Sequence, residues 1–301
     1  MGFLRFLEGI RLPVLNEFML LITWLGDETA FLVIALILFW CVNKRRGYYV
    51  MAVGFVGTIL NQFLKLLFRI PRPWVLDEKF TILEQARAGA GGYSFPSGHT
   101  QNAVGTFGAI ACTTKRRGVR IIAIVLAVLI PFSRMYVGVH TPLDVLTAAA
   151  LALALLFLLR PLVNDGKRMA ALLAGMTLLS AAFVCYVELF PFPADIDEAN
   201  LASGVKNAYT LLGAVLGMAV VYTVDEKWLK FPVKAVWWAQ ICKVFGGLAL
   251  VLAVKSGLKT PLNTICGASA GTLVRYFLVV LTAGIVWPMT FRWFARLNAK
   301  E

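Results

Sequence analysis

The sequence predicts an all-α fold, a polytopic bundle of transmembrane helices embedded in a lipid bilayer. Of the 301 residues, 59% are hydrophobic and only 15% are charged, whereas a soluble domain carries about 25% charged residues. The mean hydropathy is +0.77. Apolar stretches of roughly 17 to 25 residues recur from end to end, and each is long enough to cross a ~30 Å hydrocarbon core.

Apolar length and loop charge together predict about nine spans. They cover residues 28–43, 47–68, 98–114, 119–138, 142–162, 169–190, 206–224, 236–255 and 266–290. The segment WLGDETA, residues 24–30, also permits a separate helical hairpin at the start of the chain. Residues 1–27 mix apolar and charged side chains, which favours a helix lying at the membrane interface over a removable signal peptide.

The net charge of +13 is that of a nucleic-acid-binding protein, but its distribution indicates membrane topology instead. The basic residues stand in short blocks between the predicted spans. If the loop at 44–46 is cytoplasmic, strict alternation also places the basic loops 115–118, 163–168 and 225–235 inside. The acidic loop FPFPADIDEAN then lies outside. We therefore expect a bilayer and no nucleic acid as the partner of these charges.

Polar side chains interrupt the apolar pattern in three places, all on the predicted non-cytoplasmic side. The segments are KLLFRIPRPW after the second span, YSFPSGHTQN at the start of the third, and SRMYVGVHTPLD at the end of the fourth. An ionisable side chain within a span costs about 2.5–3.5 kcal/mol on insertion scales. A bound anion would compensate Lys65 and Arg134.

The start of the third span strengthens this interpretation. Pro96 can begin that helix, as Pro142 can begin the fifth, and the first N–H groups of a helix form an anion site. The groups expected to be free are the amides of Ser97, Gly98 and His99. Together with the cations Lys65, Arg72 and Arg134, they predict a phosphate pocket.

Three side chains add catalytic chemistry to the predicted pocket. His140 and Asp144 are four residues apart, so a carboxylate can fix the imidazole tautomer and leave the other ring nitrogen free to attack phosphorus. His99 can then serve as acid for the leaving group and as base for water. A lone histidine or arginine is more often structural, but two histidines with three cations on one side favour a catalytic site.

These residues resemble the signature of the type 2 phosphatidic acid phosphatase (PAP2) superfamily, which shares its site with glucose-6-phosphatase and vanadium haloperoxidases. The signature has three parts: a lysine six residues before Arg-Pro, a PSGH block, and Ser-Arg followed after five residues by His and after three more by Asp. The matching residues are Lys65, Arg72, Pro73, Pro96, Ser97, Gly98, His99, Ser133, Arg134, His140 and Asp144. The match has no gap.

The resemblance implies a role for each residue. Phosphate would be held by Lys65, Arg72, Ser97, Gly98 and Arg134. His140 would form the phosphohistidine, Asp144 would orient it, and His99 would be the acid and base. The resemblance implies no metal and no cofactor. The sequence agrees, because it has no HExxH motif and its five cysteines are isolated, as expected of residues that pack in an apolar core.

The resemblance covers residues 28–162 as the catalytic core, between the segment 1–27 and the helices of 163–301, which carry no motif. We expect those C-terminal helices to bound a lipid entry, bind a partner or form a homo-oligomer. A count of nine spans with the N-terminus outside is similar to that of glucose-6-phosphatase.

We expect a phosphatase for a lipid phosphate or diphosphate, active at the non-cytoplasmic face of a bacterial inner membrane. The substrate classes considered are undecaprenyl diphosphate, phosphatidylglycerol phosphate and phosphatidic acid. A lipid phosphotransferase would use the same phosphohistidine. A transporter for anionic headgroups would explain the cations but neither His140 with Asp144 nor His99, and a haloperoxidase would need bound vanadate.

Overall fold

The structure, a computed structural model, describes residues 1–297, and within that range the chain is helical and contains no strand. The expected all-α membrane bundle is confirmed. Among residues 1–297, seven helices are long and apolar enough to span a membrane, or eight if one bent pair counts as a single span. The expectation of about nine was approximate. The predicted third span is α6 (Gly98–Thr113), which has only 16 residues.

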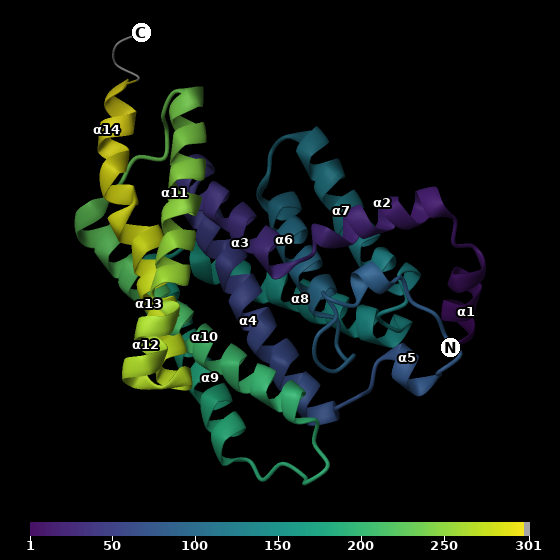
Figure 1. The fold of residues 1–301 in the computed structure, drawn as a ribbon. Coiled ribbons are helices and arrows are strands. Elements are labelled where there is room, and N and C mark those ends of the chain that lie inside the picture. Colours follow the sequence, from purple (N-terminus) through teal and green to yellow (C-terminus); the bar gives the residue numbers. More distant parts are fainter. Residues whose placement is uncertain (298–301) are drawn as a thin grey trace. The chain divides into compact units, whose positions relative to one another are not determined.

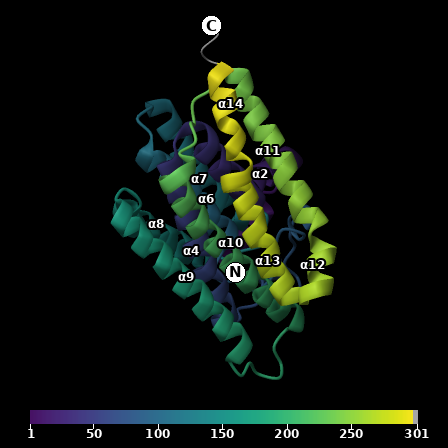
Figure 2. The same cartoon turned by 90° about the vertical axis from the view of Figure 1, so that its left-hand side faces the viewer.

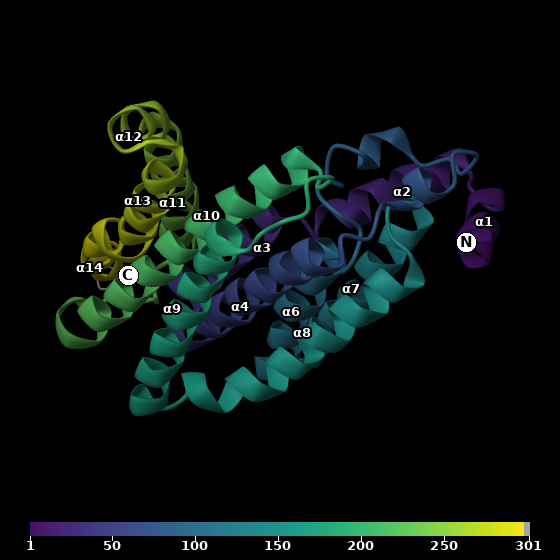
Figure 3. The same cartoon turned by 90° about the horizontal axis from the view of Figure 1, so that it is seen from below.

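The chain divides into two compact units, and every residue of the predicted site belongs to the first. This unit comprises residues 1–32, 49–160 and 193–204. Its helices, in whole or in part, are α1 (Gly2–Gly9), α2 (Pro13–Trp24), α3 (Glu28–Ile37), α4 (Lys44–Phe68), α5 (Pro73–Leu76), α6, α7 (Arg117–Tyr136) and α8 (Pro142–Val163). A loop of three residues joins α6 to α7, so the two helices pack side by side as an antiparallel pair (Figures 1 and 3).

The predicted first span, residues 28–43, corresponds to α3 and the π-helix Leu38–Val42, and the chain bends just before it. Helices α2 and α3 pass the length and hydropathy test only together, and they meet at an angle of 54°. The helix stops at Leu25, and Asp27 opens α3 by accepting a hydrogen bond from the backbone N–H of Thr29 at 2.8 Å. Two acidic residues, Asp27 and Glu28, therefore stand at a helix break between apolar segments.

The loop after α7 carries His140 and is held from two sides. Arg11, which follows α1, donates from Nε to the carbonyl of Tyr136 at 3.1 Å, and the N–H of Leu83 bonds the carbonyl of Val137 at 3.1 Å. Gly138 has φ +88, a left-handed conformation that glycine adopts without strain. These contacts, with the apolar cluster around Tyr136 and Val139, fix the loop that precedes α8.

The second unit contains residues 33–48, 161–192 and 205–301. Its helices include α9 (Gly166–Leu189), α10 (Glu198–Val224, from Val205), α11 (Trp237–Gly257), α12 (Lys259–Cys266), α13 (Ala268–Leu281) and α14 (Phe291–Arg296). Helix α13 packs against both α11 and α12 (Figure 2). Lys44 pairs with buried Asp225 at 2.7 Å, and the buried Lys243 ammonium donates to the carbonyl of Val233 at 2.9 Å.

Candidate active site

The first cation of the site lies in the last turn of α4. Lys65 is 6% exposed, and its ammonium donates to the carbonyls of Tyr93 and Ser94. Both carbonyls belong to the loop just before the PSGH block. Lys65 thus ties the end of α4 to the segment that begins α6, in addition to placing a charge in the site.

Arg72 organises the loops around the site. It precedes α5 as the N-cap residue, and its Nε and Nη2 donate to the carbonyls of Gly92 and Gly91 at 3.1 and 2.8 Å. Its Nη1 donates to the carbonyl of Val139 at 2.9 Å and lies 2.9 Å from Nε2 of His140. One buried guanidinium therefore joins the 91–92 loop to the histidine loop.

The start of α6 differs in two respects from the prediction. The helix begins at Gly98, not at Pro96, and Ser97 is its N-cap, whose hydroxyl accepts from the N–H of Thr100 at 3.3 Å. The N–H of Ser97, expected to be free, donates to the carbonyl of Asp144 at 3.1 Å. Of the three amides predicted to be free, only those of Gly98 and His99 are therefore left to bind an anion, because the first N–H groups of a helix have no intrahelical acceptor.

His140 and Asp144 meet even though they do not share a helix. Helix α8 begins at Pro142, yet Nδ1 of His140 lies 3.5 Å from Oδ2 of Asp144. That carboxylate oxygen also accepts from the hydroxyl of Ser94 at 2.6 Å and from the N–H of Thr141 at 2.7 Å. The carboxylate is thus fixed by two strong donors and faces the imidazole.

Burial, and then the guanidinium of Arg72, lower the pKa of His140 well below its usual value of 6.5. Both effects disfavour a second positive charge in the site. His140 is therefore a neutral imidazole at neutral pH, which is the state that a nucleophile requires.

Arg134 is completely enclosed near the end of α7. Its Nη1 donates to the hydroxyl of Thr23 at 2.7 Å, and the side chain is 1% exposed. Its Nε and Nη2 have no hydrogen-bond partner among residues 1–297. Because unpaired buried N–H groups of an arginine are costly, these atoms suit an anion.

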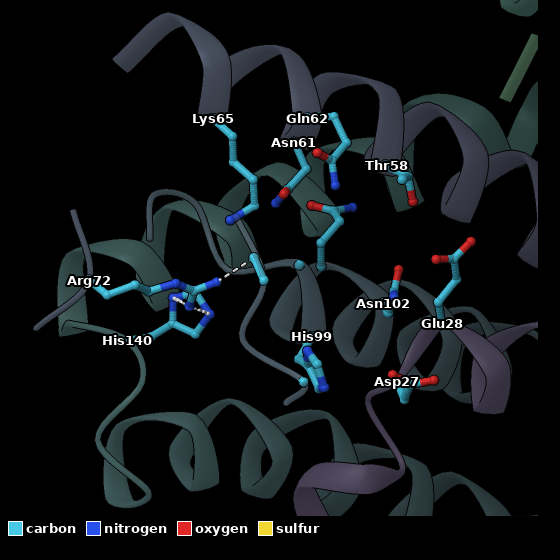
Figure 4. Close-up of a pocket in the computed structure, with 14 residues that line it drawn as sticks. Asp27, Glu28, Thr58, Asn61, Gln62, Lys65, Arg72, His99, Asn102 and His140 are labelled. Carbon is cyan, nitrogen blue, oxygen red and sulfur yellow. Dashed lines mark hydrogen bonds between the residues drawn. The ribbon is translucent and has the colours of Figure 1, made fainter. Parts of the chain in front are cut away.

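One cavity of about 190 Å³ gathers most of the predicted residues (Figure 4). The predicted residues that line it are Lys65, Arg72, Gly98, His99 and His140. Three of the predicted residues do not line the cavity in the described part of the chain: Ser97, Arg134 and Asp144. Asp144 instead contacts His140, and Ser97 caps α6. The other half of the cavity was not predicted. It is lined by Asp27, Glu28, Thr58, Asn61, Gln62, Gln101 and Asn102.

A signal for these residues was present in the sequence. Thr58, Asn61 and Gln62 precede Lys65 by seven, four and three residues, which is the spacing of one helix face. Gln101 and Asn102 directly follow the PSGH block. Polar side chains at these offsets within apolar spans point to the same cavity.

Comparison with known proteins gives the family of the segment that carries the three motifs. The PAP2 superfamily matches residues 46–168, which contain all three motifs, and the PAP2 superfamily phosphatase transmembrane extension matches residues 209–300. Phosphatidylglycerophosphatase B of Bacillus subtilis is 34% identical over 172 residues, covering 53% of this chain and 80% of that protein. The chain belongs to the PAP2 superfamily.

Two further PAP2-type relatives are undecaprenyl-diphosphatases. BcrC of Bacillus subtilis is 31% identical over 164 residues, covering 50% of this chain and 80% of that protein. The enzyme of Sulfolobus acidocaldarius is 30% identical over 137 residues, covering 45% and 65%. No solved structure matches the chain at a comparable level. The protein is thus a phosphatase of the PAP2 superfamily and an integral membrane protein.

Proposed function

We propose that this enzyme removes a terminal phosphate from a membrane lipid phosphate or diphosphate through a phosphohistidine on His140. The observation that carries the proposal is the pairing of neutral, buried His140 with Asp144 at the wall of a cavity that also holds Lys65, Arg72 and His99. The activities of the relatives, phosphatidylglycerophosphatase and undecaprenyl-diphosphatase, support this substrate range.

In the first half-reaction, Nε2 of His140 attacks phosphorus. A new N–P bond forms, the bond between phosphorus and the leaving oxygen breaks, and His99 gives that oxygen a proton. Lys65, Arg72, Arg134 and the first-turn amides of α6 stabilise the developing negative charge. Asp144 stabilises the positive charge on the imidazole.

In the second half-reaction, water attacks the phosphohistidine. His99, now deprotonated, takes the proton from that water, the N–P bond breaks, and inorganic phosphate leaves. His140 returns to the neutral state. Because the cations, helix amides and two histidines supply charge stabilisation and proton transfer, these steps need no metal ion.

A phosphate-release screen tests the proposal. Purified enzyme in detergent is supplied with phosphatidylglycerol phosphate, undecaprenyl diphosphate and phosphatidic acid, with His140→Ala as the control. We expect phosphate release from at least one lipid by the wild type and none by the variant. Release that falls when an acceptor lipid is added, with transfer of phosphate to that lipid, would instead identify a phosphotransferase.

We further propose that the cavity opens on the non-cytoplasmic side of a bacterial inner membrane, because the basic loops then lie inside. Gly91 and Gly118 provide the test, since a Cβ at either position meets no atom within 4 Å. In a cysteine-free background on intact cells, an impermeant maleimide should label Gly91→Cys and leave Gly118→Cys unlabelled. The reverse pattern would invert the orientation.

A further inference from the structure

The active-site cavity has a second half whose chemistry differs from that of the phosphate site. Thr58, Asn61 and Gln62 extend along α4 from Lys65, and Asn102 on α6 and the acidic residues Asp27 and Glu28 lie further from His140 (Figure 4). One half is therefore cationic, and the other is lined by neutral and acidic side chains. At about 190 Å³ the cavity is far larger than one water, which needs roughly 10–15 Å³.

Two amides in this second half are buried without partners. Asn61 and Gln101 are each 1% exposed and line the cavity. In the described chain, Oδ1 and Nδ2 of Asn61 and Oε1 and Nε2 of Gln101 all lack a hydrogen-bond partner. Buried polar atoms of this kind are rare in folded proteins and require an explanation.

Each amide lies beside a glycine backbone. Oδ1 of Asn61 is the nearest atom, at 3.8 Å, to the position of a Cβ on Gly98. The amide of Gln101 packs directly on the bare backbone of Gly57, leaving no room for a methyl group there. Asn61 is thus adjacent to the first turn of α6, where the phosphate is proposed to bind.

The unsatisfied atoms define the ligand. Each amide presents one acceptor and one donor group, and this remains true if its oxygen and nitrogen are interchanged. A hydroxyl group both donates and accepts, so it can accept from the N–H groups of these amides and donate to one of their oxygens. A second phosphate only accepts, and it would also approach the carboxylates of Asp27 and Glu28. An apolar chain satisfies neither atom.

We propose that Asn61 and Gln101 form a hydroxyl-binding subsite for the leaving alcohol of the substrate. The substrate class is then a lipid phosphate monoester of a polyol, with a free hydroxyl one carbon from the ester carbon, as in a glycerol phosphate headgroup. This inference rests on the proposed function, because the alcohol must lie beside the phosphate that His140 attacks. It assigns both residues to substrate specificity.

The test removes the hydroxyl from the substrate and the amide from the enzyme. Phosphatidylglycerol phosphate is compared with an analogue in which 1,3-propanediol replaces the headgroup glycerol. We expect the wild-type kcat/KM to be roughly 10- to 100-fold higher for the hydroxylated lipid, because the analogue leaves the amides unpaired. In Asn61→Leu and Gln101→Leu this ratio should fall to about 1, since no amide remains to distinguish the two lipids.

Two further variants keep the test decisive. Asn263→Leu removes an amide of α12 that is absent from the cavity lining, and it should retain the wild-type ratio. Gly57→Ala adds a methyl group that would displace the amide of Gln101, and alanine has a higher helix propensity than glycine, which favours α4. This variant should lower the ratio of the two kcat/KM values even if a leucine variant fails to fold.

The outcomes separate this inference from the proposed function. Equal wild-type turnover of the two lipids, with phosphate release still dependent on His140, would overturn the hydroxyl subsite and leave the phosphohistidine intact. A selective loss of undecaprenyl diphosphate turnover in both leucine variants would show that the amides bind a second phosphate, which also overturns it. Failure of the wild type to release phosphate from any lipid would instead contradict the proposed function.

Discussion

Nη1 of Arg72 lies 2.9 Å from Nε2 of His140 and donates at the same time to the carbonyl of Val139 at 2.9 Å. The same Nη1 lies 3.4 Å from Nδ1 of His140, so the guanidinium stands against the face of the imidazole ring and not on the lone-pair axis of Nε2. The carboxylate of Asp144, 3.5 Å from Nδ1, favours a proton on Nδ1 and a free lone pair on Nε2. We expect Asp144 to set the tautomer that leaves Nε2 nucleophilic, and Arg72 to hold the plane of the ring.

Arg72→Lys should lower kcat/KM by roughly 100-fold. A lysine keeps the charge, but its single ammonium cannot bond the carbonyls of Gly91, Gly92 and Val139 in the planar arrangement of a guanidinium. Steady-state kinetics on phosphatidylglycerol phosphate measures the effect. Arg87→Lys, at an exposed residue paired with Glu84, is the control, and a loss of only a few-fold in Arg72→Lys would refute this role.

Activity should survive EDTA and should be inhibited by orthovanadate. In the proposed mechanism, the cations and helix amides neutralise the charge that a metal would otherwise neutralise. Residues 1–297 contain no cluster of three or more His, Cys, Asp or Glu side chains that is suited to a metal. Vanadate can take a five-coordinate form beside His140. Activity that disappears in EDTA and returns with Mg²⁺ would contradict this chemistry.

The stability of the protein should fall as the pH drops below about 6.5, partly through His140. Its pKa is lowered in the folded state, so the unfolded chain takes up a proton that the folded chain refuses. The contribution to stability is therefore complete above the unfolded pKa and decreases below it. Thermal unfolding in detergent at pH 7 and pH 5 should show a smaller loss of Tm for His140→Gln than for wild type. Equal losses would show that His140 does not contribute.

Asp225→Asn should destabilise the second unit by about 1–3 kcal/mol. Asp225 is buried, pairs with Lys44 at 2.7 Å and accepts from the N–H of Phe231 at 3.3 Å. The neutral side chain of Asn at position 225 would leave the partly buried ammonium of Lys44 without a counter-ion. Unfolding in detergent measures the change, and Glu226→Gln, at an exposed neighbour, should have little effect. The same stability in both variants would mean that the pair contributes nothing.

The sequence was sufficient for the cationic half of the site because charges in an apolar span are conspicuous. Lys65 and Arg72, which line the cavity, stand at fixed spacings from His99 and His140. Arg134 was equally conspicuous, but it is buried beside Thr23 and does not line the cavity. The neutral half was missed because Asn61 and Gln101 carry no charge and belong to no motif. Their significance appears only once burial leaves their amides unpaired.

Local geometry limited the prediction in two places. A helix start alone predicts free amides, but the N–H of Ser97 is taken by the carbonyl of Asp144, a residue 47 positions away, and sequence spacing does not reveal such a contact. The apolar run of residues 98–114 was counted as a full span. It forms a helix of 16 residues, because the chain leaves the helix at Thr114 before the basic block.

The central claim is that His140 carries the phosphoryl group while His99 transfers protons. A nitrophenyl phosphate substrate separates the two roles, because its leaving group departs without a proton. Rapid-mix nitrophenol release, measured together with acid-labile phosphate on the protein, is the decisive experiment. His99→Ala should give a burst of about one nitrophenol per enzyme and accumulate phosphohistidine while steady turnover fails. His140→Ala should give neither, and a burst in His140→Ala but not in His99→Ala would reverse the assignment.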